Sequence, residues 1–95
     1  MLLKLQDLYI DTDKIATLGV FENINSRYYE AGFCLNGVNY DVYNADGEPD
    51  TEQKEFIHNK LRELINIIMS VTNKEIKEIK FDFNFPVEEI DDQSR

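Results

Sequence analysis

Residues 28–44 read YYEAGFCLNGVNYDVYN, and they carry the clearest structural pattern in the sequence. Runs of aromatic and β-branched residues flank Asn36-Gly37, the dipeptide preferred in the type I′ turn of a β-hairpin. The stretch therefore predicts two antiparallel strands, 28–35 and 38–44. Such a turn also determines which residues face each other across the strands. The predicted pairs are Leu35 with Val38, Phe33 with Tyr40, and Ala31 with Val42.

Side chains of a strand point alternately to its two faces, so the paired residues are predicted to share the face that packs on the core. The other face is predicted to be solvated and to carry Tyr28, Glu30, Cys34, Asn39, Asp41 and Tyr43.

The residues before the hairpin predict further strands of the same sheet. Residues 15–22 have Ala16, Leu18 and Val20 on one side, and Gly19 weakens this strand or marks a bulge. Residues 2–10 predict a first strand that is interrupted near Gln6-Asp7. We therefore expect the first half of the chain to form an antiparallel meander of three or four strands.

A turn signal at residues 45–49 leads into a long amphipathic helix. Asp50 or Thr51 is the predicted N-cap, and Gln53 completes a variant of the capping box. Asn73 is predicted to end the helix. Apolar residues recur at the helical period and form one continuous stripe, made of Ile57, Leu61, Leu64, Ile65 and Ile68.

Residues 79–85 alternate between apolar and polar side chains, which predicts a final strand with Ile79, Phe81, Phe83 and Phe85 on one face. Pro86 ends this strand, and the residues after it are acidic and show no packing pattern. The predicted organisation is a single domain, 1–86, followed by an acidic flexible tail, 87–95. The predicted fold class is α+β: an antiparallel meander of four or five strands, including the C-terminal strand, with one long amphipathic helix packed on one face.

Acidity is the one compositional outlier. The chain has 19 Asp and Glu residues against 10 Lys and Arg residues, a formal net charge of -9. Such a surface repels nucleic acid and anionic membranes and attracts basic partners, although acidity can also serve solubility alone. The sequence shows no apolar run that suits a signal peptide or a membrane span, and Cys34 is a lone cysteine. We therefore expect a cytoplasmic protein.

The acidic residues are densest between positions 41 and 55. A helix N-terminus uses one or two carboxylates, whereas this stretch has more, opposed only by Lys54. We therefore expect a binding surface for a basic protein, with tyrosines that are typical of protein interfaces. The predicted partner-binding residues are Asp41, Asp46, Glu48, Asp50, Glu52, Glu55, Tyr28 and Tyr43.

The apolar arc of the helix is wider than the stripe of about 100° that is typical of surface helices. Phe56 and Ile67 widen the arc on one flank and Met69 on the other, which predicts an oligomer interface at these residues. The alternative is that the Phe-rich C-terminal strand and the tail cover these side chains.

The sequence shows no constellation that would carry catalysis or hold a metal. Two acid-rich stretches match part of the EF-hand ligand spacing, but Ala16 and Pro49 stand where that loop needs glycine. A catalytic histidine needs an orienting carboxylate and a nucleophile or substrate pocket, but no Ser-centred elbow, paired Cys or second His accompanies His58. Cys34 has no cationic neighbour that would activate its thiol. We therefore predict no catalytic residue, no metal site and no cofactor.

These patterns predict a non-enzymatic binding module that presents an acidic surface to a basic protein. A sharper form of this hypothesis is an inhibitor, for example one encoded by a phage, that mimics nucleic-acid charge to block a nucleic-acid-binding defence enzyme. The first alternative is a small assembly protein that forms a homo-oligomer through its helix or sheet face. The second alternative is a small enzyme or ligand-binding domain.

Overall fold

The computed structural model describes residues 2–71, 76–83 and 86–91 of the chain. These residues form an α+β fold, as predicted. The helices are the 3-10 turn η1 (Thr12–Lys14) and the long helix α1 (Thr51–Ser70). The strands of the described part are β1 (Leu2–Leu5), β2 (Leu8–Asp11), β3 (Leu18–Ile24), β4 (Tyr28–Leu35), β5 (Val38–Asp46), β6 (Ile76–Lys80) and β7 (Glu88–Asp91).

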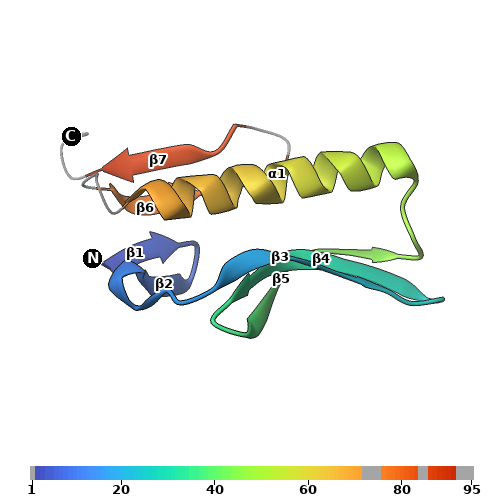
Figure 1. Cartoon of the computed structure of the whole chain (residues 1–95). Coiled ribbons are helices and arrows are strands. Elements are labelled where there is room, and N and C mark those ends of the chain that lie inside the picture. Colours follow the sequence, from blue (N-terminus) through green and yellow to red (C-terminus); the bar gives the residue numbers. More distant parts are fainter. Residues whose placement is uncertain (1, 72–75, 84–85, 92–95) are drawn as a thin grey trace.

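The strands form two sheets instead of the single meander that the sequence predicted (Figure 1). Sheet B is an antiparallel meander of β3, β4 and β5, whereas sheet A has the strand order β2-β1-β6-β7. The difference arises because β1 pairs in parallel with β6, from the far end of the chain, through Lys4 opposite Glu78 and Leu5 opposite Ile79. This non-local pairing cannot be recognised from local sequence patterns.

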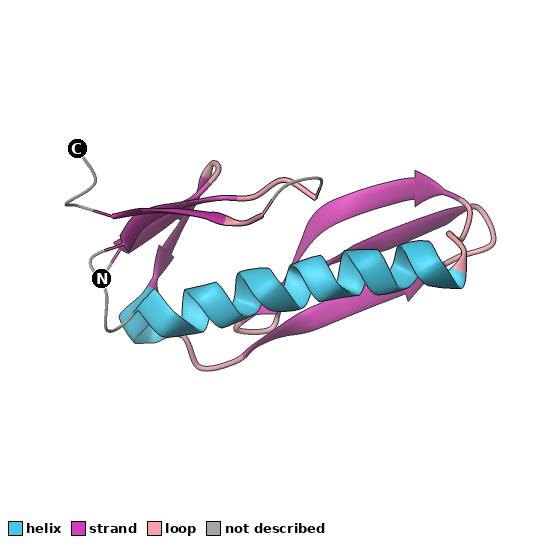
Figure 2. Cartoon of the chain, turned by 90° about the horizontal axis from the view of Figure 1, so that it is seen from above, coloured by secondary structure: helices cyan, strands magenta, loops and turns pink. Residues whose placement is uncertain are grey.

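Helix α1 lies across both sheets and joins them (Figure 2). Its 20 residues span about 30 Å at about 1.5 Å each, which is long enough to cover two small sheets placed side by side. The molecule is accordingly elongated, with extents of 45 × 27 × 19 Å. The predicted stripe faces inward: Ile57, Leu61, Leu64 and Ile68 are buried, and Ile65 is half-buried.

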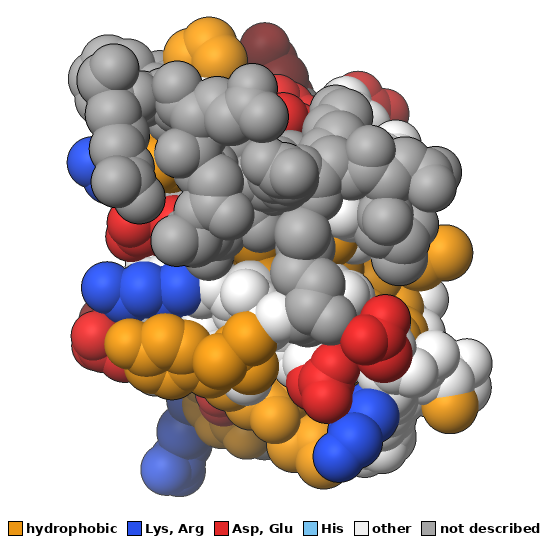
Figure 3. All heavy atoms as spheres, turned by 90° about the vertical axis from the view of Figure 1, so that its left-hand side faces the viewer, with side chains coloured by type: hydrophobic (Ala, Val, Ile, Leu, Met, Phe, Trp, Pro, Cys, Tyr) orange, Lys and Arg blue, Asp and Glu red, His pale blue; other side chains and the backbone are white. Residues whose placement is uncertain are grey.

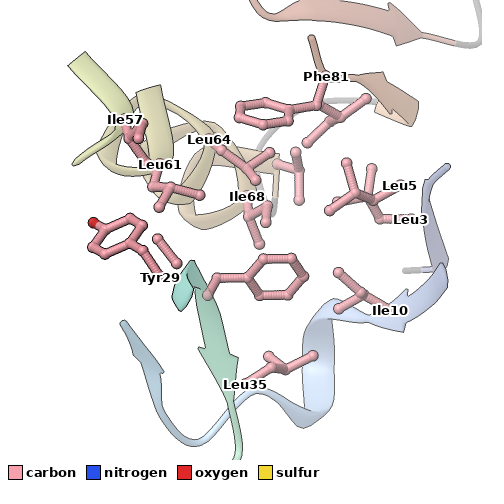
Figure 4. Packing of buried hydrophobic residues seen from close by; sticks show 14 residues of the cluster. Leu3, Leu5, Ile10, Tyr29, Leu35, Ile57, Leu61, Leu64, Ile68 and Phe81 are labelled. Atoms are coloured by element: carbon pink, nitrogen blue, oxygen red, sulfur yellow. The ribbon is translucent and has the colours of Figure 1, made fainter. Parts of the chain in front are cut away.

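One core lies under the helix and is shared by the two sheets (Figure 4). Sheet A contributes Leu3, Leu5, Ile10 and Ile79, and sheet B contributes Tyr29, Ala31, Phe33 and Leu35. Because both sheets pack against the same helix, neither has a core of its own. The described part of the chain is therefore a single packing unit.

The start of the helix agrees with the prediction. The side chain of Asp50 accepts a hydrogen bond of 2.8 Å from the backbone N–H of Gln53, which makes Asp50 the N-cap. The last helical residue is Ser70, followed by Val71 at the C-cap. Asn73, the predicted end, lies outside the described residues.

The predicted hairpin turn is confirmed. Asn36 and Gly37 both have positive φ, 51° and 82°, and Leu35 faces Val38. The side chain of Asn36 also binds the loop before β3, because its Oδ1 accepts from the N–H groups of Ala16 and Thr17 at 2.7 and 3.1 Å. These bonds hold residues 16 and 17 outside the sheet, so β3 begins at Leu18 and not at Ile15 as predicted.

The hairpin register changes at a β-bulge that the sequence did not reveal. Phe33 faces Tyr40 as predicted, but Ala31 faces Tyr43 and not Val42. The bulge lies beside Gly32, where a Cβ atom would collide with the backbone oxygen of Tyr40 and come within 2.9 Å of the Phe21 ring. Glycine is therefore required there. The prediction that Tyr43 lies on the solvated face is wrong, because the bulge turns it towards the core.

Gly19 lies in β3 without a register shift, so it marks no bulge. The predicted interruption near Gln6-Asp7 is a tight turn, with φ of 52° at Gln6, and it divides the first predicted strand into β1 and β2. The side-chain amide of Gln6 donates to the carbonyl of Phe81 at 3.1 Å. This bond ties the turn to the residues that follow β6.

The C-terminal part departs furthest from the sequence pattern. Strand β6 ends at Lys80, so Phe81 and Phe83 lie beyond it, yet both pack against the core. Phe85 lies outside the described residues. Residues 88–91, predicted as part of a flexible tail, form β7, which pairs antiparallel with β6. An acid-rich edge strand lacks the apolar alternation that would have revealed it.

Candidate functional site

Five of the predicted partner-binding acids cluster where β5 leads into α1. They are Asp46, Glu48, Asp50, Glu52 and Glu55, and we call this group the acidic rim. It lies at the end of the molecule opposite the two termini (Figure 1). Tyr28 belongs to the same end, because it faces Asp46 across the β4–β5 pair and its side chain is 41% exposed.

Most carboxylates of the acidic rim form no ion pair or hydrogen bond within the described part of the chain. Asp50 is used as the helix cap, and Glu48 forms a partly exposed ion pair of 3.6 Å with Lys54. The backbone of Arg27 also lies near the rim, since its carbonyl accepts from the N–H of Gly47 at the end of β5. Ion pairs near the surface contribute little to stability, so the rim carboxylates other than Asp50 have no large structural role.

Asp41 and Tyr43 do not belong to the acidic rim. Asp41 is roughly 15 Å from Asp46 along β5, because each strand residue advances about 3.3 Å. Both residues instead line a groove where the two sheets and α1 meet. The structure thus divides the predicted partner-binding residues into two places.

This junction groove consists of two adjoining hollows. The first has a volume of about 320 Å³ and is lined by Leu5, Gln6, Asp7, Leu8, Phe33, Tyr40, Asp41, Val42, Leu64 and Phe81. The second has a volume of about 430 Å³, shares Gln6, Asp41, Val42 and Phe81, and adds Tyr43, Gln53, Phe56, Asp82 and Phe83. Both volumes lie in the range of about 300–1,000 Å³ that is typical of ligand sites.

Aromatic rings form much of the groove wall. Phe33 and Tyr40 stack with ring centroids 5.2 Å apart. Phe83 lies edge-on to both Tyr43 and Phe81, at 5.5 and 5.0 Å. These contacts link sheet B to the residues after β6 and hold the rings in fixed positions. The wall is therefore a preformed aromatic surface.

Carboxylates are the only charged groups among the described residues that line the groove. They belong to Asp7 in the β1–β2 turn, Asp41 at the bulge and Asp82 after β6. Within the described chain, the carboxylates of Asp7 and Asp41 have no ion-pair or hydrogen-bond partner. The groove thus combines an aromatic wall with uncompensated negative charge.

A second cluster joins α1 to sheet B at His58. Glu22 Oε2 lies 3.1 Å from His58 Nε2 and 2.8 Å from the hydroxyl of Tyr29, and the hydroxyl lies 3.2 Å from His58 Nε2. A catalytic histidine needs an orienting carboxylate, and no sequence pattern identifies one for His58. Glu22 supplies one from β3, and no local pattern reveals a contact between such distant residues.

The proton positions in this cluster follow from the state of Tyr29. Burial, then the hydrogen bond to Glu22, and then the charges of Glu22, Tyr43 and Glu48 raise the pKa of Tyr29 well above its ordinary value. The hydroxyl therefore stays protonated and donates to Glu22, so the Nε2–H of His58 is the donor to the other two groups. Tyr29 is fully buried, so the hydrogen bonds of this cluster stabilise the packing of α1 on sheet B.

The predicted oligomer interface is not one continuous surface. Phe56, 39% exposed, lines the junction groove, and Ile67 is half-buried on the same flank. Part of that flank is covered, because Val87 packs on the core and its N–H donates to Glu63 at 3.3 Å. Met69 is 59% exposed on the other flank.

Met69 borders a third hollow with Ile15 and Leu18, near the end of α1. Hydrophobic side chains lie among charged ones on that end of the molecule (Figure 3). Cys34 is half-buried, unpaired and opposite Asn39 as predicted.

Among the residues that the structure describes, no three His, Cys, Asp or Glu side chains are grouped so as to hold a metal ion. No helix in the described ranges has the length and hydrophobicity needed to cross a membrane. The chain matches no protein-family model, no curated protein and no solved structure.

Proposed function

We propose that this protein is a non-enzymatic binding module that presents its acidic rim to a basic protein. The observation that carries the proposal is the placement of Asp46, Glu48, Glu52 and Glu55 in exposed positions at one end of the molecule. Only Asp50 of the rim has a structural task as a cap. Carboxylates held on a strand end and a helix start create a directed negative field, which speeds the encounter with a positive partner.

A nucleic-acid-binding protein is the partner class that fits this field best. Its Lys and Arg residues are arranged to meet phosphates, and fixed carboxylates can take the place of phosphates in such a groove. In this role the module is an inhibitor that competes with nucleic acid for the partner. The proposed compartment is the cytoplasm, on the basis of the lone Cys34.

The test is capture of binding proteins from cells that make this protein, followed by rate measurements with the purified partner. We expect the association rate to fall as salt is raised, because salt screens exposed charges. Replacing Asp46→Asn, Glu48→Gln and Glu52→Gln together should weaken binding at low salt by about fivefold or more, chiefly through the association rate. The melting temperature should change little, because only the partly exposed Glu48–Lys54 pair is lost.

A matched control removes the same charge elsewhere. The triple variant Asp13→Asn, Glu88→Gln and Glu89→Gln changes exposed carboxylates outside the acidic rim. It should alter the association rate much less than the rim variant. Equal effects of the two variants, or a partner affinity that does not respond to salt, would overturn the proposal and leave the acidity with a role in solubility.

A further inference from the structure

We infer that the junction groove receives an arginine side chain of the basic partner. This inference rests on the proposed function and assigns a second, more selective contact to it. The groove lies between α1, β5 and the β1–β2 turn, on residues distinct from the acidic rim. The carboxylates of the groove are therefore a different set from those of the acidic rim.

The lining of the groove matches the parts of an arginine side chain. Leu5, Leu8 and Val42 offer an apolar surface for the methylene stem. The rings of Tyr40 and Phe56 line the first and the second hollow, and a planar guanidinium stacks on the face of such a ring. A cation in the groove also lies near the carboxylates of Asp7 and Asp41. The described lining residues include no Lys, Arg or His that would neutralise them.

Asp41 lies where the two hollows of the groove adjoin. The bulge places Asp41 and Val42 together opposite Gly32, and both line each of the two hollows. Asp7 borders the first hollow from the β1–β2 turn. A guanidinium can donate paired hydrogen bonds to a carboxylate while it stacks on a ring, whereas the ammonium of lysine is compact and strongly hydrated. The groove should therefore prefer arginine to lysine.

The experiment uses three capped peptides as probes: N-acetyl tri-arginine amide, its tri-lysine counterpart and its tri-citrulline counterpart. Citrulline keeps the shape of arginine but lacks its charge. Binding to the full chain is measured by titration calorimetry, and the contact surface is mapped by amide chemical shifts. We expect tri-arginine to bind most tightly, tri-citrulline not to bind, and the shifts to centre on Asp41, Val42 and Phe81.

Matched variants separate the groove from general charge. Asp7→Asn with Asp41→Asn should weaken tri-arginine binding by about fivefold or more, because both carboxylates border the first hollow. Asp13→Asn with Glu88→Gln removes the same charge from exposed positions outside both the groove and the acidic rim, and should weaken it by less than about twofold. Retained amide shift dispersion shows that each variant is folded.

Three outcomes would overturn the inference: equal weakening by both pairs of substitutions, equal affinity for tri-arginine and tri-lysine, or shifts that centre outside the groove. Failure of the proposed function gives a different result. If the groove substitutions have no effect while the rim variant still slows association with the captured partner, arginine binding in the groove is contradicted and the proposed function is not. If the rim variant has no effect either, the proposed function is contradicted as well.

Discussion

Gly32 shows how one residue determines both the sheet and the site. Its missing Cβ lets β5 approach closely, and the resulting bulge sets Asp41 and Val42 at the groove. The sequence shows Gly32 only as one of four glycines, with no local sign of this role. The requirement comes from the backbone oxygen of Tyr40, which belongs to the neighbouring strand.

We predict that Gly32→Ala destabilises the protein by about 1–3 kcal/mol, because the added methyl group forces the two strands apart. Gly19→Ala is the matched control, since Gly19 also lies in a strand but no atom lies within 4 Å of the added Cβ. This control should be neutral or stabilising by roughly 0.5–1 kcal/mol, because alanine restricts the unfolded chain more than glycine does. Urea unfolding of both variants is the measurement, and similar stabilities would show that the bulge does not depend on Gly32.

Asn36 has a comparable double role. It supplies the positive φ of the turn, and its side chain also donates to the carbonyl of Lys14 at 2.9 Å. The turn at Asn36 could be predicted from the sequence, because the Asn-Gly dipeptide alone indicates it. The contact with the loop before β3 is not, because it depends on where a separate segment passes.

At the scale of elements, the contact of α1 with sheet B depends on a polar cluster as well as on apolar packing. The hydroxyl of Tyr29 joins β4 to Glu22 of β3 and to His58 of the helix. A buried hydroxyl with two partners is costly to remove, since each partner then loses a hydrogen bond.

We predict that Tyr29→Phe lowers the free energy of unfolding by about 1–2 kcal/mol near neutral pH. The exposed Tyr28→Phe is the control and should have little effect. The difference should shrink above about pH 10, where a tyrosine in the unfolded chain releases its proton. The folded protein has a raised Tyr29 pKa and keeps that proton. The unfolded state then binds fewer protons, so the stability that Tyr29 provides falls as pH rises.

Urea unfolding of the wild type and both variants, at pH 8 and again above pH 10, checks this prediction. If the wild type and Tyr29→Phe lose stability in parallel across that interval, Tyr29 ionises alike in the folded and unfolded chains. The hydroxyl would then be less buried in the protein than its contacts indicate.

At the scale of the whole molecule, the sequence predicted elements better than it predicted their partners. The hairpin turn and the helix cap are set by residues a few positions apart, and both are confirmed. The pairing of β1 with β6 and the division into two sheets depend on contacts between distant segments. For the same reason the acidic rim could be proposed from its sequence cluster, whereas the junction groove, built from separate segments, could not.

The C-terminal segment provides a test of the whole arrangement. Deleting residues 87–95 removes β7, exposes the edge of β6 and breaks the Val87–Glu63 hydrogen bond. We predict a loss of about 2 kcal/mol or more, from lost strand pairing and from the half-buried Val87 side chain. Thermal unfolding measures it. Glu88→Gln keeps the strand and removes the charge of one exposed residue, so it should leave the melting temperature nearly unchanged. A truncated protein that melts like the wild type would instead fit the flexible tail predicted from sequence.

The parallel pair of β1 and β6 also has a consequence for the order of events during synthesis. The β1–β2 hairpin leaves the ribosome before β3, β4 and β5, but a two-stranded hairpin is at best marginally stable alone, and its partner β6 emerges only after α1. The core residues of this hairpin therefore stay exposed to solvent while β3, β4 and β5 form their sheet; they are Leu3, Leu5 and Ile10. Non-local closure is slow, and chains in this interval are the ones most prone to aggregate or to recruit a chaperone. Pulsed hydrogen exchange during refolding should show the amides of β4 protected before those of β1, and the reverse order would contradict this sequence of events.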